Sequence, residues 1–192
     1  MVDRSTEREG GSMQVGVAPR PLPRMWHAEA CGRKGATEVG QMVAHRRNVV
    51  VTGESPVDEL IMEVMTMDRE GGGRGRFRLM RVREMIAEAK EAGQFCAMFR
   101  RRLLELTQLG RVVLFITELE LLPLLCEKPQ LLYPEEDPQR VQRIVTHLLD
   151  MLVELVRNEE VVCVAYSRMQ RLHPLIKHDK LASVFRAMIT SN

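Results

Sequence analysis

Residues 48–65 read NVVVTGESPVDELIMEVM, and this stretch decides the fold because its apolar pattern changes from that of a strand to that of a helix. Residues 49–51 are three consecutive valines, which is typical of a strand buried on both faces of a parallel sheet. Residues 53–56 include glycine, serine and proline, which favour a turn. Apolar residues then recur at helical spacing at Leu60, Ile61, Val64 and Met65. A strand, a turn and a helix in this order predict an α/β fold.

The same stretch has the outline of a phosphate-binding loop without the residues that bind phosphate. The pattern GxxxxGK[ST] needs glycines to wrap the phosphates, a lysine to neutralise them and a hydroxyl to hold Mg²⁺. Starting from Gly53, the chain has Asp58 at the second glycine, Glu59 at the lysine and Leu60 at the hydroxyl. Unit charges about 4 Å apart interact by about 4 kcal/mol at an effective dielectric near 20, so glutamate replaces an attraction with a repulsion of that order. The alternative is an ordinary strand and helix.

Two later apolar runs predict further buried parallel strands, at residues 112–116 and 161–164. Thr117 and Glu118 follow the first of these runs. In nucleotide hydrolases a strand that ends in two carboxylates positions Mg²⁺ with the first and polarises the attacking water with the second. Here a threonine stands first and a glutamate second. A single glutamate at a strand end is otherwise a cap or a solvated residue.

The remaining pattern predicts helices between the strands. The expected helices are 37–45, 83–110 with an interruption near Gly93, and 137–157 with Asp137 as N-cap and Pro138 in the first turn. Further strands are expected at 77–82 and 187–190. We expect helix 137–157 to cover the sheet, because parallel sheets need helices on both faces; the alternative is a partner-facing helix.

Composition limits the classes of function. The chain has 192 residues with 28 Lys and Arg against 26 Asp and Glu, a net charge of +2, which implies no obligatory nucleic acid or anionic membrane partner. No apolar run approaches the roughly 20 residues of a membrane span, so we expect a soluble protein. The cysteines Cys31, Cys96, Cys126 and Cys163 are scattered along the chain. His173 and His178 are five residues apart, so they would not lie on the same face of a helix. Reduced structural thiols and no metal site are therefore expected, in an intracellular protein.

Residues 1–30 differ from the rest of the chain. They contain glycines, three prolines and both charges with little periodicity, so we expect a mobile or partner-ordered tail followed by one α/β domain at 31–192. Four arginines in the tail suggest an organelle transit peptide as an alternative, although acidic residues are unusual in one. The compartment is thus either the cytoplasm or an organelle, a plastid or a mitochondrion.

Two segments are candidate contact surfaces. Arg74, Arg76 and Arg78 belong to a Gly- and Arg-rich segment, which is either an RNA-contacting loop or a loop into a strand with solvated arginines; we favour the second, since the interleaved aromatic residues are limited to Phe77. Residues 121–138 form a long connection that contains six leucines. Its leucines are a candidate partner surface if they are exposed, with Leu124, Leu125, Leu131 and Leu132 as its members.

Five segments in order resemble the first AAA+ module of ClpB-type chaperones and related Clp ATPases. They are GESPVDEL at 53–60, AKEAGQF with RRRLLEL at 89–106, RVVLFITEL at 111–119, VVCVAYS at 161–167 and HDKLASVF at 178–185. In that family these segments are the Walker A loop, the pore loop with its following helix, Walker B, sensor 1 and the arginine-finger region. The resemblance extends from about residue 33 to 190 and implies a P-loop NTPase-like core of three layers, with a mostly parallel sheet of about five strands.

The departures from the family concern its working residues. By the resemblance, Glu59 stands at the Walker A lysine, Leu60 at the Mg²⁺-binding threonine and Thr117 at the Walker B aspartate, while Glu118 matches the catalytic glutamate. Glu91 replaces the pore-loop aromatic residue, between Lys90 and Gly93. Threonines of sensor 1 and arginines of the finger are also replaced, at Tyr166, Ser167, Ser183 and Val184. Because the chain ends at Asn192, the helical lid of the family is expected to be missing.

This combination predicts a fold that is retained although the residues that act on ATP have been replaced. The leading hypothesis is a pseudo-ATPase, without a catalytic residue or cofactor, that acts as a structural or protein-interaction module in a larger assembly or Clp-type complex. The first alternative is a divergent Clp-type chaperone subunit that binds ATP and Mg²⁺. The second is an RNA-contacting component of a ribonucleoprotein.

Overall fold

The computed structural model describes residues 26–30, 33–53, 56–70, 75–157, 161–167, 179–185 and 187–191, with side chains from residue 37 to 185 within these ranges. Its centre is an all-parallel sheet of four strands in the order β2-β5-β4-β3. These strands are β2 (Val49–Gly53), β3 (Arg76–Arg81), β4 (Val112–Thr117) and β5 (Val161–Ser167). Two more parallel strands, β6 (Ala187–Ser191) and β1 (Trp26–Ala30), continue the sheet beyond β2.

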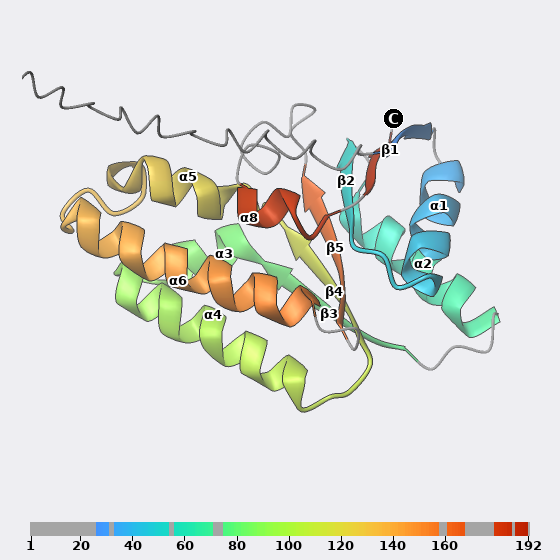
Figure 1. The fold of residues 1–192 in the computed structure, drawn as a ribbon, viewed down its shortest axis with the longest axis horizontal. Helices are drawn as coiled ribbons and strands as arrows, with labels where there is room; N and C mark the ends of the chain where they lie inside the picture. Colours follow the sequence, from blue (N-terminus) through green and yellow to red (C-terminus); the bar gives the residue numbers. More distant parts are fainter. Residues whose placement is uncertain are drawn as a thin grey trace, which may run out of the picture.

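Helices cover both faces of this sheet (Figure 1). On one face lie α1 (Arg33–Ala44) and α2 (Val57–Glu70). On the other lie α3 (Val82–Glu88), α4 (Ala92–Thr107), α5 (Leu121–Glu127), α6 (Pro138–Arg157) and the short α8 (Asp179–Ala182), with a 3-10 turn η1 at Pro129–Leu131. The two-sided cover explains why β2, β4 and β5 are buried along their whole length.

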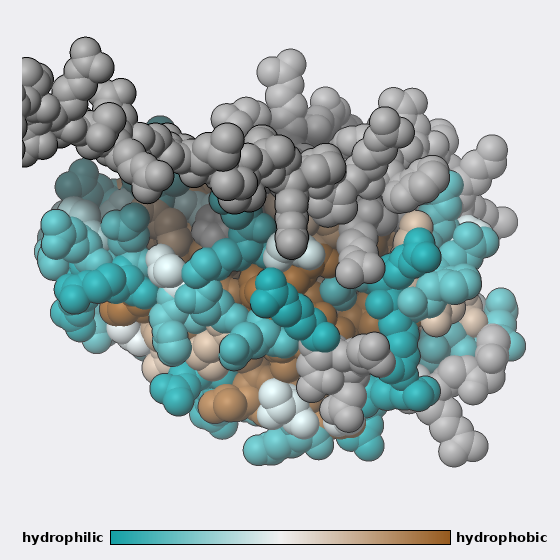
Figure 2. Space-filling view, viewed as in Figure 1, coloured by the Kyte–Doolittle hydropathy of each residue, from teal (hydrophilic) through white to brown (hydrophobic). Residues whose placement is uncertain are grey.

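Alternation along the strands divides the core into two clusters. In β2, Val49 and Val51 pack with α1 and α2, whereas Val50 belongs to the cluster of α3–α6. The larger cluster is filled by the apolar stripe of α6 and by Phe95 and Phe99 of α4, which lie with ring centroids 5.7 Å apart. Figure 2 shows that the outer surface of the α4–α6 side is largely hydrophilic, with apolar side chains visible between the polar ones.

Most expected elements are confirmed. The expected strands are present as β2, β3, β4, β5 and β6, and α6 covers the sheet as expected. Its N-cap is also confirmed, because the Gln139 N–H donates to Asp137 Oδ1 at 3.1 Å. No helix in the described ranges is long and apolar enough to cross a bilayer.

Three expectations need correction. Residues 26–30, expected in a mobile tail, form strand β1, whose pairing with β6 comes from the other end of the chain and has no local signal; residues 1–25 lie outside the described ranges. The helix expected at 83–110 ends at Thr107 and not at Gly110, whereas its expected interruption near Gly93 is confirmed at 89–91, where the Ala92 N–H donates to Glu136 Oε1 at 2.6 Å. The connection at 121–138 contains α5 and η1.

Candidate functional site

The carboxyl ends of the parallel strands lie along one edge of the sheet, the carboxyl edge. The register pairs Thr52 with Ser167 across β2 and β5, and Thr117 with Tyr166 across β4 and β5. Arg81 pairs with Thr117 across β3 and β4. Ligands of open α/β sheets bind outside this edge. The sheet therefore brings the carboxyl ends of β2, β5, β4 and β3 side by side.

Gly53 ends β2 and is tied to β5. Its φ of 154° lies in a region that glycine adopts far more readily than other residues. The Gly53 carbonyl accepts a buried hydrogen bond of 2.9 Å from Tyr166 Oη. Tyr166, near the end of β5, thus fixes the end of β2; the next two residues, 54–55, lie outside the described ranges.

The start of α2 carries two acidic side chains and one buried leucine. Asp58 and Glu59 are exposed in the first turn, where negative charge suits the helix dipole. Leu60 has 7% of its surface exposed and packs into the core with Val64 of the same helix. A phosphate would meet two carboxylates here, and Leu60 is part of the hydrophobic core.

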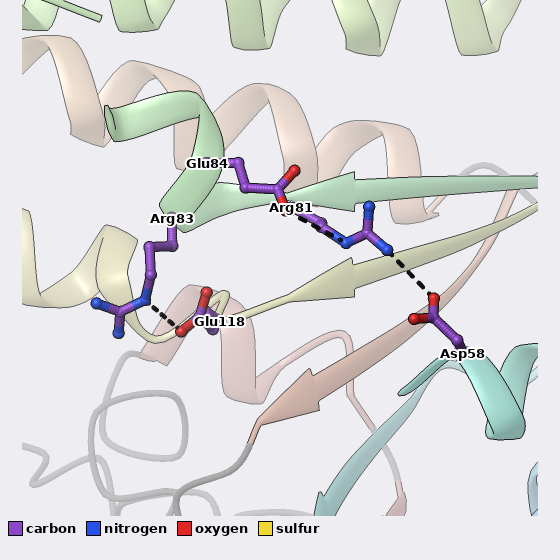
Figure 3. A network of polar contacts seen from close by, with 5 residues as sticks. All are labelled: Asp58, Arg81, Arg83, Glu84 and Glu118. Atoms are coloured by element: carbon purple, nitrogen blue, oxygen red, sulfur yellow. Dashed lines mark hydrogen bonds and ion pairs between the residues drawn. The ribbon is translucent and has the colours of Figure 1, made fainter. Parts of the chain in front are cut away.

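Two arginines pair with carboxylates at this edge (Figure 3). The Arg83 Nε lies 2.5 Å from Glu118 Oε1, and the Arg81 guanidinium lies 3.2 Å from Asp58 Oδ1 and 3.6 Å from Glu84 Oε1. Glu118 has a φ of 58°, a left-handed conformation that costs on the order of 1 kcal/mol for a residue other than glycine. Its own N–H donates to the Tyr166 carbonyl at 2.9 Å. The glutamate that resembles a catalytic base is therefore held by a neighbouring cation and by the backbone.

Beside this pair lies a buried carboxyl that sequence reasoning missed. Glu120 is 6% exposed, and its Oε1 accepts a hydrogen bond of 2.7 Å from Ser167 Oγ. Its Oε2 is buried without a hydrogen-bond partner. Burial raises the pKa of Glu120, and the hydrogen bond from Ser167 opposes that rise. The sequence around each residue does not reveal the contact between Glu120 and Ser167, because Glu120 stands between leucines and Ser167 is the last residue of a different strand.

Thr117 is placed where expected, at the end of β4, and is 7% exposed. It offers no carboxylate for Mg²⁺. Within the described part of the chain, no group of three or more His, Cys, Asp and Glu could hold a metal ion. The described part of this edge thus consists of ion pairs between arginines and carboxylates and of buried polar groups.

The pore-loop-like residues are in a different environment. Lys90, Glu91 and Gly93 lie where α3 passes into α4, and the Lys90 N–H donates to Gln94 Oε1 at 2.9 Å. The Phe95 N–H donates to the Glu91 carbonyl at 3.1 Å, and Ala92, between Glu91 and Gly93, donates to Glu136 in the segment before α6. In the finger-like segment, Val184 and Phe185 are buried, and the side chain of Arg186 lies outside the described ranges.

The candidate leucine surface is correct in part. Leu131 and Leu132 are 63% and 37% exposed, and Leu124 is half-buried. Leu125 is fully buried and cannot belong to a surface, so the leucines of α5 do not share one environment.

Among the described cysteines Cys96, Cys126 and Cys163 are free thiols, and burial raises the pKa of each. Cys31, His173 and His178 lie outside the described ranges.

Arg76 and Arg78 are exposed on β3, as expected for solvated arginines of a strand; Arg74 lies outside the described ranges.

The chain matches no model of a protein family and no curated protein.

Proposed function

We propose that the chain is a catalytically inactive P-loop NTPase-like module, similar to the first AAA+ domain of ClpB-type chaperones, that serves as a structural or protein-interaction module. The parallel α/β sheet supports this proposal. It places the ends of β2, β5 and β4 side by side, as the counterparts of Walker A, sensor 1 and Walker B must lie to act on one nucleotide.

The observation that carries the loss of activity is the pairing of carboxylates with arginines at this edge. Glu118 pairs with Arg83, and Asp58 pairs with Arg81. A water-activating glutamate must be accessible to the attacking water and near a metal-bound phosphate. Here the glutamate faces a guanidinium, and the helix that would receive the phosphate begins with Asp58 and Glu59. Binding a nucleotide would require breaking these pairs and placing its negative charge beside Asp58 and Glu59.

Titration calorimetry with MgATP and MgADP tests this proposal. We expect no heat of binding at nucleotide concentrations up to the millimolar range. The matched variant is Glu118→Gln, which keeps the shape of the side chain and removes its charge. Binding at millimolar or tighter affinity that changes in this variant would contradict the proposal.

One observation favours the alternative of a divergent ATPase subunit. Glu118 retains the identity and the strand-end position of the catalytic glutamate, and its side chain is 25% exposed. A partner could supply the missing cations. ATP turnover that requires such a partner and is lost in Glu118→Gln would establish this alternative.

A further inference from the structure

Strand β3 ends the sheet on one side, so one side of its backbone has no partner strand among the described residues. Beside this edge lies a groove of about 480 Å³ between β3, α3 and α4. Its lining includes the apolar side chains of Met80, Met85 and Met98 and charged side chains of β3, α3 and α4, namely Arg81, Glu84, Glu88, Arg101, Arg102 and Glu105. An exposed strand edge beside a groove can accept an added strand.

The side chains of β3 alternate between the two faces of the sheet. Arg76 and Arg78 are exposed on the same face as Met80, which is 4% exposed in the cluster of α3 and α4. Phe77 and Leu79 point to the opposite face and pack against the cluster of α1 and α2. The face toward the groove therefore reads arginine, arginine, methionine at every second residue.

The charges along this edge are unequal. Arg81 pairs with Asp58 and Glu84, while Arg101 and Arg102 share Glu105 at 3.2 and 3.4 Å. Arg76 and Arg78 instead donate to backbone carbonyls, those of Leu109 at 3.0 Å and Phe77 at 2.9 Å. No ion pair joins either arginine to a carboxylate in the described part of the chain. The first half of β3 therefore carries two positive charges that acidic side chains could neutralise.

We infer that the edge of β3 binds an extended segment of a partner protein with two acidic residues and one apolar residue at alternate positions, acidic-x-acidic-x-apolar. A strand added in parallel lies about 4.8 Å from β3, with its alternate side chains opposite Arg76, Arg78 and Met80. Its acidic residues pair with the arginines, and its apolar residue enters the groove over Met85 and Met98. This inference rests on the proposed function as an interaction module and specifies the partner surface.

Two other occupants fit this edge less well. A second copy of β3 would place arginines opposite arginines, and like charges directly across two strands are destabilising. Single-stranded RNA is bound by aromatic side chains that stack on bases next to basic residues. Phe77, the aromatic residue of this strand, lies on the face opposite Arg76 and Arg78 and is stacked on Phe115 at 6.3 Å. It is therefore not available to a base beside those arginines.

Fluorescence anisotropy with a labelled peptide, TEVEVLT, tests the inference on the full chain at low salt. The control peptide TEPPELT has the same charges, and its adjacent prolines remove an N–H from each side of the strand, so it cannot pair regularly whichever side faces β3. We expect the first peptide to bind at least 10-fold more tightly than the second. The double variant Arg76→Glu with Arg78→Glu should weaken its binding at least 10-fold. The matched control is Arg47→Glu with Arg143→Glu, which makes the same charge change at exposed arginines of the α1–β2 turn and α6 and should change affinity less than 2-fold.

Hydrogen exchange of the unmodified chain gives a second readout that does not depend on the folding of a variant. Bound TEVEVLT should slow amide exchange in β3 more than in β2. Equal binding of the proline peptide, unchanged affinity in the β3 double variant, or no added protection of β3 would each overturn the inference. Binding of a uridine oligonucleotide that requires Arg76 and Arg78, without peptide binding, would overturn it in favour of RNA. Failure of the peptide test together with absence of MgATP binding removes this inference and leaves the proposed function standing.

Discussion

The interior of the sheet and its carboxyl edge follow different physical rules. Inside, β2, β4 and β5 are apolar and buried on both faces, and each side chain contacts many others of similar character. At the edge, stability depends on single polar contacts such as Tyr166 with Gly53, Ser167 with Glu120 and Arg83 with Glu118. Apolar packing tolerates many exchanges that conserve volume, whereas a specific polar site loses its chemistry with one exchange.

Under the proposed function, this difference accounts for a fold that keeps its parallel sheet without the residues that bind a nucleotide. The packing of the valines at 49–51 does not depend on whether residue 59 is a lysine or a glutamate, because Glu59 is exposed on α2. Exposed edge residues such as Glu59 contribute little to the core, so their replacement leaves the sheet intact. The following changes test this separation, from the largest expected effect to the smallest.

Phe115→Ala tests the interior. Phe115 is fully buried in β4, and we expect the variant to lose about 3–5 kcal/mol of unfolding free energy, because it removes contacts and leaves a cavity. Urea unfolding followed by circular dichroism measures this loss. Leu131→Ala is the matched surface control and should change stability by less than about 0.5 kcal/mol, since Leu131 is 63% exposed. Equal effects of the two substitutions would contradict the described core.

Glu120→Gln tests the buried carboxyl through the pH dependence of stability. The pKa of Glu120 is raised by burial above its ordinary value of 4.5, so the folded protein holds this proton more tightly than the unfolded chain does. The contribution of the protonated Glu120 to folding stability is complete below pH 4.5 and is lost as pH rises through the pKa of Glu120 in the folded protein. Relative to the variant, the unmodified protein should lose stability as pH rises from 4.5, with a slope of at most about 1.4 kcal/mol per pH unit. Urea midpoints of both proteins between pH 4 and 8 give this difference, and parallel pH profiles would count against a raised pKa.

Tyr166→Phe tests the link between β5 and the end of β2. The substitution removes the hydroxyl that donates to the Gly53 carbonyl at 2.9 Å and keeps the ring. We expect a loss of about 1–2 kcal/mol, because the carbonyl is left in a buried position without this donor. Faster amide exchange near Gly53 should accompany it. Val162→Ala, on the same strand and side of the sheet, is the control: it should lower stability without a local increase of exchange at Gly53.

The interior could be predicted from the sequence, and much of the edge could not. Valine runs at 49–51 and 161–164 identify buried strands, because burial on both faces requires continuous apolar character. The strand near residues 187–190 was also predictable from its pattern. Strand β1 was not, since its pairing with β6 joins the two ends of the chain.

At the edge, sequence placed Thr117 and Glu118 at the end of a strand, because position along the chain is enough for that inference. It could not identify the partner of Glu118, which depends on how α3 leaves β3, or the contact between Glu120 and Ser167. Leu125 shows the same limit: whether a leucine in a short helix is buried depends on the direction of that helix. Side-chain partners that are distant in sequence are fixed by the packed fold.

The pair of Arg83 and Glu118 should have the smallest effect on stability. Its atoms lie 2.5 Å apart, but the Arg83 side chain is 68% exposed, so water screens the attraction and the side chain loses entropy on pairing. A double-mutant cycle with Arg83→Ala and Glu118→Ala should therefore give a coupling of about 0.5–1 kcal/mol in low salt, and less in high salt. The cycle of Arg101→Ala and Glu105→Ala, an exposed pair on α4, provides the reference for a surface ion pair. A coupling of several kcal/mol would place Glu118 among the groups that hold the fold together, and the separation of interior and edge would then be wrong at this residue.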